Sequence, residues 1–250
     1  MKYLKLFDTE SAYKAYRDGA AGGGYIKPNV SLCDDNGNVY YNYSPFNGYD
    51  YVDLGLPSGT LWTTCNVGAS KPSDAGLYFQ WGDTSGYTAN QVGIGEGKKK
   101  FASDWSDYKW RLSGDSDSNV TFTKYTTPGA TLELEDDAAH VNMGGDWHMP
   151  TPTQIQELLD NTTSAWAILD EVNGMKFTSK SDPSKSIFIP AVGFAYGGTV
   201  RNSGTEADVW SSMLNTDDNN HGQYLYFNSG LAGLYGNGRY GGFSVRGVVG

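Results

Sequence analysis

The sequence predicts an α+β fold with short strands, few helices and long irregular loops. Gly accounts for 33 of the 250 residues and aromatic residues for 14%, whereas charged residues reach only 18%. This composition is typical of a loop-rich globular chain with a core of aromatic side chains. The length suits one large domain, or one large domain and one small one. Scattered strand patterns with one or two helices favour an α+β architecture.

The first 48 residues are predicted to form a small αβ module. Residues 2–7 alternate like a strand, and residues 9–17 read as a short helix that three glycines end. Residues 30–33 and 39–43 flank an Asn-Gly pair, which is a hairpin signal because these residues tolerate positive φ. A module of this size has little core of its own. We therefore expect residues 1–48 to serve in docking or oligomerisation.

Residues 49–250 are expected to form the large domain. Its clearest helix begins with Thr151 as the cap and Pro152 in the first turn. The apolar stripe of this helix follows at the spacing of helical turns: Ile155, Leu158 and Leu159. A weaker helix pattern covers residues 134–141. Strand patterns occur at residues 78–81, 187–190, 224–227 and 242–246.

Charge and hydropathy argue against two classes of partner. The net charge is −10 and the pI is about 4.6, so nucleic acid is not expected, because phosphate binding needs clustered Lys and Arg. No stretch approaches the length of a membrane span, and no membrane insertion is expected. Lys2 and Lys5 interrupt what would be the apolar part of a secretory signal. We therefore expect a protein that acts in the cytoplasm or leaves the cell without a cleaved leader.

No pattern of metal ligands or catalytic residues is apparent. Three histidines, at 140, 148 and 221, do not have zinc-site spacing, and Cys33 and Cys65 favour two reduced, buried thiols, with one bridge possible. Residues 115–119 and 217–222 alternate oxygen donors but lack the closing Glu of a calcium loop, so we interpret them as solvated loops. The carboxylates at 135–137 are expected at a helix start. The sequence predicts no cofactor, no metal and no enzymatic activity.

The last forty residues have the composition of a recognition surface. Trp210, Phe243 and Val245 are expected to be core anchors, and the chain between them is rich in Tyr, Asn, Ser and Gly. Tyr offers rigid amphipathic contact area, and Asn, Ser and Gly offer adaptable hydrogen bonds. Most of the seven tryptophans are expected in the core, with Trp105 and Trp110 as candidates for exposure. This composition favours binding over catalysis.

Several segments, in order, resemble the Fibrobacter succinogenes major paralogous domain, which is common in gut Bacteroidetes and their phages. The matching segments are residues 51–62, 65–69, 79–83, 136–139, 145–151, 189–193, 209–212 and 242–246. The family usually has Arg where His148 stands and Tyr where Val209 stands. The resemblance implies a C-type-lectin-like fold, which variable proteins of diversity-generating retroelements also use. It implies a fixed framework beneath the variable face as well: Trp62, Trp81, Trp147, Trp210, Phe243 and Val245.

In such retroelement systems, randomised adenines turn Asn codons into a restricted set of residues. Residues 224–245 contain no Lys, Glu, Gln, Met or Trp, as this rule expects. The resemblance therefore implies a variable region at about 210–246 with ligand-binding positions at His221, Tyr224, Tyr226, Leu231, Gly233, Leu234, Tyr235, Gly236, Asn237, Gly238 and Gly241. Arg239 and Tyr240 join them as candidate hot spots, since Arg and Tyr are enriched at such centres. The alternative is that these are ordinary loop residues of an unmutated paralogue.

The expected function is a non-enzymatic, receptor-binding adhesin of a phage tail tip, located in the virion. Its partners would be a bacterial cell-surface protein or glycan, and a phage tail structural protein held through residues 1–48. A homotrimer is expected weakly, from related tropism determinants. Formylglycine-generating enzymes share the broad fold but use a cysteine pair near the end of the domain, and this chain has no cysteine after Cys65. The alternative is a host surface or secreted lectin-like protein, located at the bacterial cell surface and without hypervariability.

Overall fold

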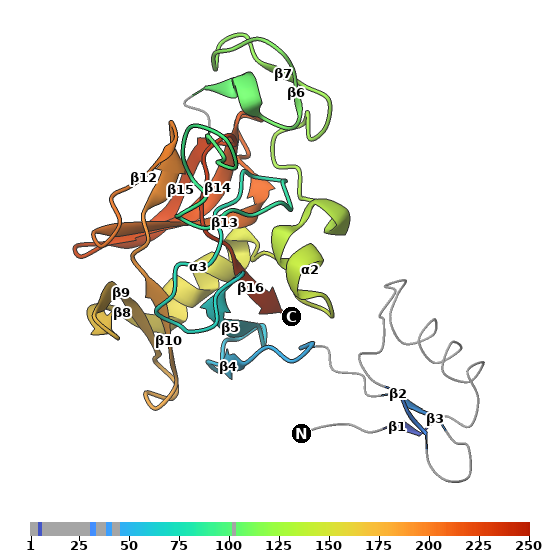
Figure 1. Cartoon of the computed structure of the whole chain (residues 1–250). Coiled ribbons are helices and arrows are strands. Elements are labelled where there is room, and N and C mark those ends of the chain that lie inside the picture. The colour runs from blue at the N-terminus through green and yellow to red at the C-terminus, as the bar shows by residue number, and fades with distance from the viewer. Residues whose placement is uncertain (1–4, 7–30, 34–38, 42–45, 102–103) are drawn as a thin grey trace.

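The computed structural model describes residues 5–6, 31–33, 39–41, 46–101 and 104–250, with side chains from residue 46 onward. Strands make up 39% of the structure and helices 11%. The protein is thus mostly β-sheet with few helices (Figure 1), as an α+β or mostly-β fold requires.

The N-terminal module contains a three-stranded antiparallel sheet in the order β1-β3-β2. Its strands are β1 (Lys5–Leu6), β2 (Ser31–Cys33) and β3 (Val39–Tyr41). The predicted pairing of the two strands around the Asn-Gly turn is confirmed. The helix expected at 9–17 and the turn residues 34–38 lie outside the described residues.

Within residues 46–101 and 104–250, the strands form three sheets of three strands and two hairpins. The three-stranded sheets, in strand order, are β16 (Arg246–Val249), β5 (Leu61–Asn66) and β4 (Tyr51–Asp53); β10 (Ser186–Pro190), β9 (Val172–Ser179) and β8 (Thr162–Leu169); and β13 (Glu206–Leu214), β14 (His221–Asn228) and β15 (Ala232–Gly238). The hairpins are β6 (Arg111–Ser113) with β7 (Thr121–Phe122), and β11 (Phe194–Tyr196) with β12 (Thr199–Arg201). Since β16 pairs with β5, the beginning and the end of the large domain are hydrogen-bonded to each other.

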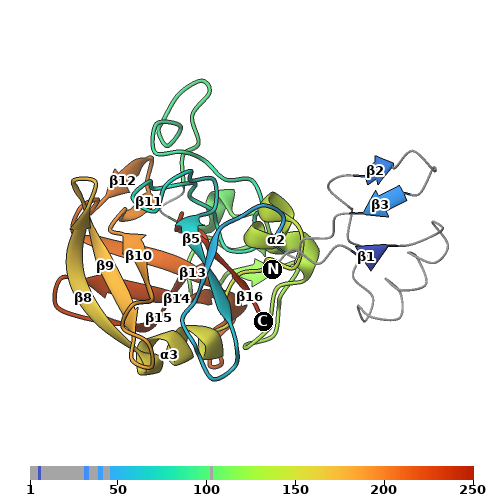
Figure 2. The same cartoon turned by 90° about the horizontal axis from the view of Figure 1, so that it is seen from below.

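Helix α3 (Pro152–Asn161) confirms the predicted start signal. The Thr151 hydroxyl accepts from the Gln154 backbone N–H, and the Gln154 side chain accepts from the Thr151 backbone N–H, so a complete capping box is present. Ile155 and Leu158 are buried and Leu159 is half-buried. These side chains belong to the same apolar cluster as residues of β13, β14 and β15. The view from below shows α3 beside this sheet (Figure 2).

The weaker helix predicted at 134–141 is split in two by Asp137. A 3₁₀ turn, η2 (Leu134–Asp136), precedes α2 (Ala138–Met143), and a second 3₁₀ turn, η1 (Trp105–Asp107), lies earlier in the chain. Asp137 has extended backbone angles, and its carboxylate accepts from the backbone N–H groups of His140 and Met149. It therefore caps α2, in agreement with the expectation that these carboxylates lie at a helix start.

Two of the four strand patterns form regular strands. Residues 187–190 lie in β10 and residues 224–227 in β14. Residues 78–81 form only single bridges, such as Phe79 with Phe243, and of the pattern at 242–246 only Arg246 lies in a regular strand, β16. The carbonyl of Phe79 accepts from both Phe243 N–H and the Trp210 indole. These apolar segments cross the core, where side chains of distant elements take up part of their backbone bonding. The hydrophobic pattern of a sequence does not indicate which backbone groups bond to side chains of distant elements.

The aromatic frame is buried, as expected. Each of its six residues is at most 1% exposed: Trp62, Trp81, Trp147, Trp210, Phe243 and Val245. The expectation that Trp105 is exposed is wrong, because this side chain is 1% exposed. Its indole N–H donates to Asp117 Oδ1 at 2.8 Å, and its ring packs edge-on against Tyr240 and Phe122. Trp110 is half-buried.

Candidate binding face

The suspected variable residues lie mainly on the sheet of β13, β14 and β15. In this antiparallel sheet Tyr224 pairs with Tyr235 and Tyr226 with Gly233, while Leu225 pairs with Leu234. Directly paired residues share a face, and successive residues alternate between faces. The sheet therefore divides the suspected positions between an inner and an outer face.

The inner face of this sheet belongs to the core. Leu225 and Phe227 are completely buried, and the half-buried Leu234 packs against the same apolar cluster, which includes Ile155 and Leu158 of α3. Leu234 was expected to contact a ligand. In the structure this side chain packs against the core beneath β15, so it supports the sheet and is not a free surface residue.

The outer face carries three tyrosines in mutual contact. The ring centroids of Tyr224 and Tyr235 lie 6.4 Å apart, and those of Tyr226 and Tyr235 lie 5.5 Å apart. Tyr235 is 47% exposed, Tyr226 is half-buried, and Tyr224 is only 8% exposed. Tyr224 also packs on Trp210 and Phe243, so the outermost ring rests on the buried frame through it.

Exposure separates the thirteen candidate positions into three groups. The exposed group is Leu231, Tyr235, Gly236 and Asn237. The half-buried group is His221, Tyr226, Gly233, Leu234 and Tyr240. The buried group is Tyr224, Gly238, Arg239 and Gly241. Leu231 directly precedes β15, and the other three exposed residues are consecutive within that strand. Together these four residues form the accessible rim of the candidate face.

Arg239 does not lie on that rim. It is 0% exposed, and its guanidinium carbon lies 3.5 Å from the centre of the Phe122 ring, with the Tyr108 and Trp81 rings at 5.3 and 5.7 Å. Its Nη1 donates to the Tyr125 carbonyl at 3.3 Å. The expectation of an exposed hot spot at Arg239 is wrong, because the segment around β7 encloses this side chain in an aromatic cage. Burial lowers its pKa.

Tyr240 and three glycines are also constrained by their neighbours. The Tyr240 ring packs against Trp105, with centroids 4.8 Å apart. A Cβ at Gly236 would lie 2.4 Å from Asn215 Nδ2, and one at Gly238 would lie 2.6 Å from the Tyr240 ring. One at Gly241 would lie 3.0 Å from the Phe243 ring. Larger residues there require neighbouring side chains to shift.

Two carboxylates on β13 join the outer face, and the sequence analysis did not identify them. Asp208 pairs with Tyr226, and Glu206 with Asn228, so both side chains are on the tyrosine side of the sheet. Glu206 accepts from the Tyr226 hydroxyl at 3.1 Å and from Asn202 at 2.8 Å. Asp208 is 3% exposed, and burial, together with the neighbouring Glu206, raises its pKa to about 8. Because β13 is buried on both faces, its sequence has no regular alternation of polar and apolar residues that would place Asp208 on the outer face.

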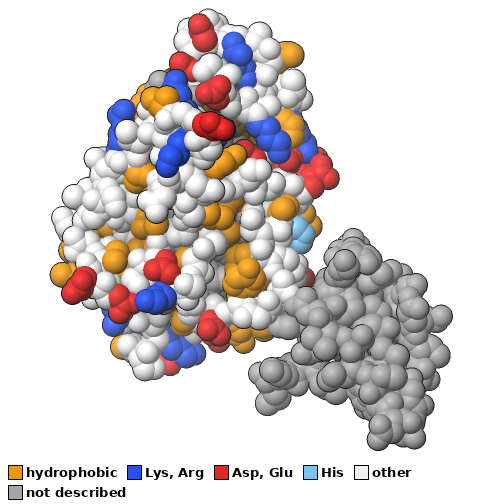
Figure 3. All heavy atoms as spheres, in the orientation of Figure 1, with side chains coloured by type: hydrophobic (Ala, Val, Ile, Leu, Met, Phe, Trp, Pro, Cys, Tyr) orange, Lys and Arg blue, Asp and Glu red, His pale blue; other side chains and the backbone are white. Residues whose placement is uncertain are grey.

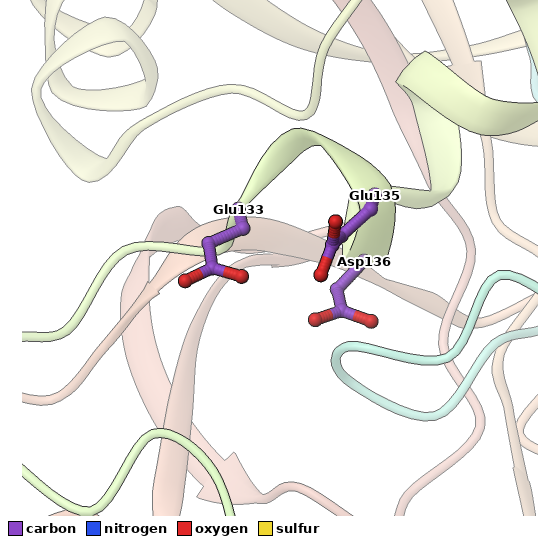
Figure 4. A group of neighbouring side chains, drawn as sticks. All are labelled: Glu133, Glu135 and Asp136. Carbon is purple, nitrogen blue, oxygen red and sulfur yellow. The ribbon is translucent and has the colours of Figure 1, made fainter.

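A second acidic group surrounds a lysine. Among the described residues, the one group of His, Cys, Asp or Glu with metal-like proximity is Glu133, Glu135 and Asp136, whose carboxylates lie within 4.8 Å of one another (Figure 4). The ammonium of Lys124 lies 2.5, 3.2 and 2.6 Å from these three carboxylates. Burial opposes the shift, but hydrogen bonds from Lys124 and Tyr125 hold the pKa of Asp136 below its usual range. A protein cation thus occupies the centre of this group.

The two oxygen-rich loops form turn hydrogen bonds of their own and also bond to each other, since the Asn220 side chain donates to the Asp117 carbonyl. Asn119 Oδ1 accepts from the backbone N–H groups of Asp115 and Ser116. Asp218 Oδ1 accepts from the backbone and the ring of His221. These are the bonds of tight turns. Cys65 is half-buried rather than buried, and the side chain of Cys33 lies outside the described residues.

The fold and the face define a mostly-β domain with a tyrosine-rich sheet surface on a buried aromatic frame. Comparisons with protein-family models, with curated proteins and with solved structures gave no match. Within the described residues, no helix is long and apolar enough to cross a membrane.

Proposed function

We propose that the protein is a non-enzymatic receptor-binding adhesin with a C-type-lectin-like fold, which binds a bacterial surface target through the outer face of β14 and β15. The single observation that carries this proposal is the contrast within one hairpin. Tyr235 and Asn237 are exposed, while Tyr224, directly opposite Tyr235, is anchored on the frame of Trp210 and Phe243. Exposed side chains on a rigid aromatic support can change without loss of the fold.

The surface supports a contact of mixed polarity. Figure 3 shows one side of the molecule, on which apolar side chains lie among uncharged ones and basic and acidic side chains are interspersed. On the candidate face, the exposed side chains are those of Leu231, Tyr235 and Asn237. Tyr and Asn at the rim add hydrogen-bonding groups to apolar area, as recognition surfaces require. We place the protein at the tail tip of a phage, with residues 1–48 as its attachment to the tail.

The test combines Leu231→Ala, Tyr235→Ala and Asn237→Ala in one variant. These positions are exposed, so each change should alter the free energy of unfolding by no more than about 0.5 kcal/mol. Binding of the labelled protein to cells of gut Bacteroidetes, measured by flow cytometry, should fall by about tenfold or more. A matched control replaces Leu112 and Ile168, which are 64% and 70% exposed and lie on other strands.

Equal cell binding by both variants would overturn the proposed face. A large loss of thermal stability in the triple variant would overturn the separation of frame and contact residues.

The alternative, a host surface protein without hypervariability, draws support from a specific observation. Gly238, Arg239 and Gly241 are buried, so part of the suspected variable set has little freedom to change. The gene's surroundings separate the two: a reverse transcriptase gene with a near-identical template repeat supports the phage adhesin, and their absence from the sequenced locus supports the host protein.

A further inference from the structure

The Asp208 carboxylate is buried on the candidate binding face without a partner. It is 3% exposed, and its backbone carbonyl, not its side chain, accepts the bonds from Ser244. Among the described residues no hydrogen bond or ion pair reaches the carboxylate, whereas Glu206, two residues away, is held by Tyr226 and Asn202. The polar atoms of Asp208 are not among the completely enclosed, unpaired ones of the described residues. A small part of this residue is therefore exposed.

The surroundings of this carboxylate suit an organic cation. Tyr226 lies directly opposite on β14, and Tyr224 is close enough for the charge of Asp208 to contribute to its raised pKa. Tyr235 extends the aromatic surface outward from both rings. Aromatic faces attract ammonium and guanidinium groups. A cation that also donates hydrogen bonds can offset the cost of burying a carboxylate. An unpaired buried carboxylate is costly, which marks such positions as candidate functional sites.

We propose that Asp208 is the anchor for a Lys or Arg side chain of a protein target, which enters between the tyrosines of the outer face. This inference rests on the proposed function and names the chemistry of its ligand. A protein side chain fits better than a glycan, because the cation must reach a carboxylate of which little is exposed. Lys and Arg carry their charge on a slender apolar stem, whereas an amino sugar carries its amine directly on a bulky ring.

Binding of a cation should favour the ionised form of Asp208, which burial disfavours in the free protein. Glu206 on β13, Tyr224 and Tyr226 on β14 and Tyr235 on β15 are the titratable groups that face Asp208. Burial raises the pKa of Tyr224 and of Tyr226 above the usual tyrosine value, so these two hydroxyls stay neutral below pH 9. The pKa of Asp208, at about 8, means that binding of a cation at neutral pH releases a proton. Affinity should rise from pH 6 to pH 8 and level off above.

The experiment titrates the full chain with n-butylammonium and n-butylguanidinium chloride, followed by the chemical shifts of the tyrosine rings in NMR. The neutral analogue 1-butanol and the amino sugar glucosamine serve as comparison ligands. Asp208→Asn tests the anchor, and Asp182→Asn, an exposed carboxylate on another segment, controls for the loss of one charge. Thermal unfolding of each variant confirms that it is folded.

Saturable binding of both alkyl cations, weakened about thirtyfold or more by Asp208→Asn but unchanged by Asp182→Asn, supports the proposal. The proposal is overturned if Asp208→Asn binds as the parent does, if 1-butanol binds equally well, or if affinity is flat between pH 6 and 8. Glucosamine binding as tight as that of n-butylammonium would overturn the choice of a protein side chain. Failure here with a loss of cell binding in the Leu231, Tyr235 and Asn237 variant would refute the anchor and leave the proposed function intact.

Discussion

At the scale of single residues, Arg239 shows that an arginine in a recognition-like segment can be a packing residue rather than a binding residue. Arg is enriched at binding hot spots and also stacks well on aromatic rings. Here the rings of Trp81, Tyr108 and Phe122 surround it. Two of its nitrogens, Nε and Nη2, have no hydrogen-bond partner among the residues that the structure describes. Arg239 therefore acts as a packing residue that joins the end of β15 to the segment around β7.

The cage around Arg239 leads to a stability prediction. Arg239→Ala should lower the free energy of unfolding by about 2–4 kcal/mol, because it leaves a cavity beneath three rings. Arg239→Met should recover most of this loss, since it fills the space and removes a buried charge with unpaired donors. Chemical denaturation of the two variants measures the difference. Equal losses in both would show that the charge, not the volume, carries the stabilisation.

At the scale of elements, α3 supports the binding face from behind. Its capping box fixes where the helix begins, and its apolar stripe packs against Leu225, Phe227 and Leu234. The orientation of the outer face therefore depends on a helix whose start is encoded in four consecutive residues. The pairing register of β14 and β15 then brings Tyr224, Tyr226 and Tyr235 to the same face of the sheet.

The cap of α3 can be tested by a conservative pair of substitutions. Thr151→Ala removes the hydroxyl that accepts from Gln154 and should cost about 1 kcal/mol of unfolding free energy. Thr151→Ser keeps that acceptor and should stay close to the parent. Thermal unfolding with both variants side by side measures this. A stability of Thr151→Ala equal to that of the parent would mean that packing alone fixes the helix start.

At the scale of the whole molecule, the buried Asp208 links the binding face to global stability. In the unfolded chain its pKa returns to about 4, whereas in the folded protein it is about 8. A carboxyl with a raised folded pKa favours folding when protonated. Its contribution is fully present below pH 4 and is lost as pH rises through 8.

The free energy of unfolding of the parent, relative to that of Asp208→Asn, should therefore decline between pH 4 and pH 8, by an amount on the order of a few kcal/mol. Urea denaturation of both proteins at several pH values measures the difference. Asp182→Asn, at an exposed position, should follow the parent throughout. Parallel pH profiles for the parent and Asp208→Asn would contradict the burial of an unpaired carboxyl.

The sequence by itself determined the local features of this protein. Neighbouring residues or plain hydrophobicity encode the pairing of residues 31–33 with 39–41, the Thr151 cap, the strands at 187–190 and 224–227 and the burial of the aromatic frame. The exposed positions Tyr235 and Asn237 belong to this group, because the polar, aromatic composition of their segment is a surface signal.

Only the tertiary structure decided which candidate residues share a surface. Trp105 and Arg239 are buried because both pack against Phe122, and Arg239 lies more than a hundred residues further along the chain than the two aromatic residues. Asp208 joins Tyr226 because β13 pairs with β14 in one particular register. Periodicity within a strand fixes which residues point to the same face. The partner strand, the helix behind the sheet and the loops in front of it decide which face meets solvent. These contacts join residues that are far apart in the sequence.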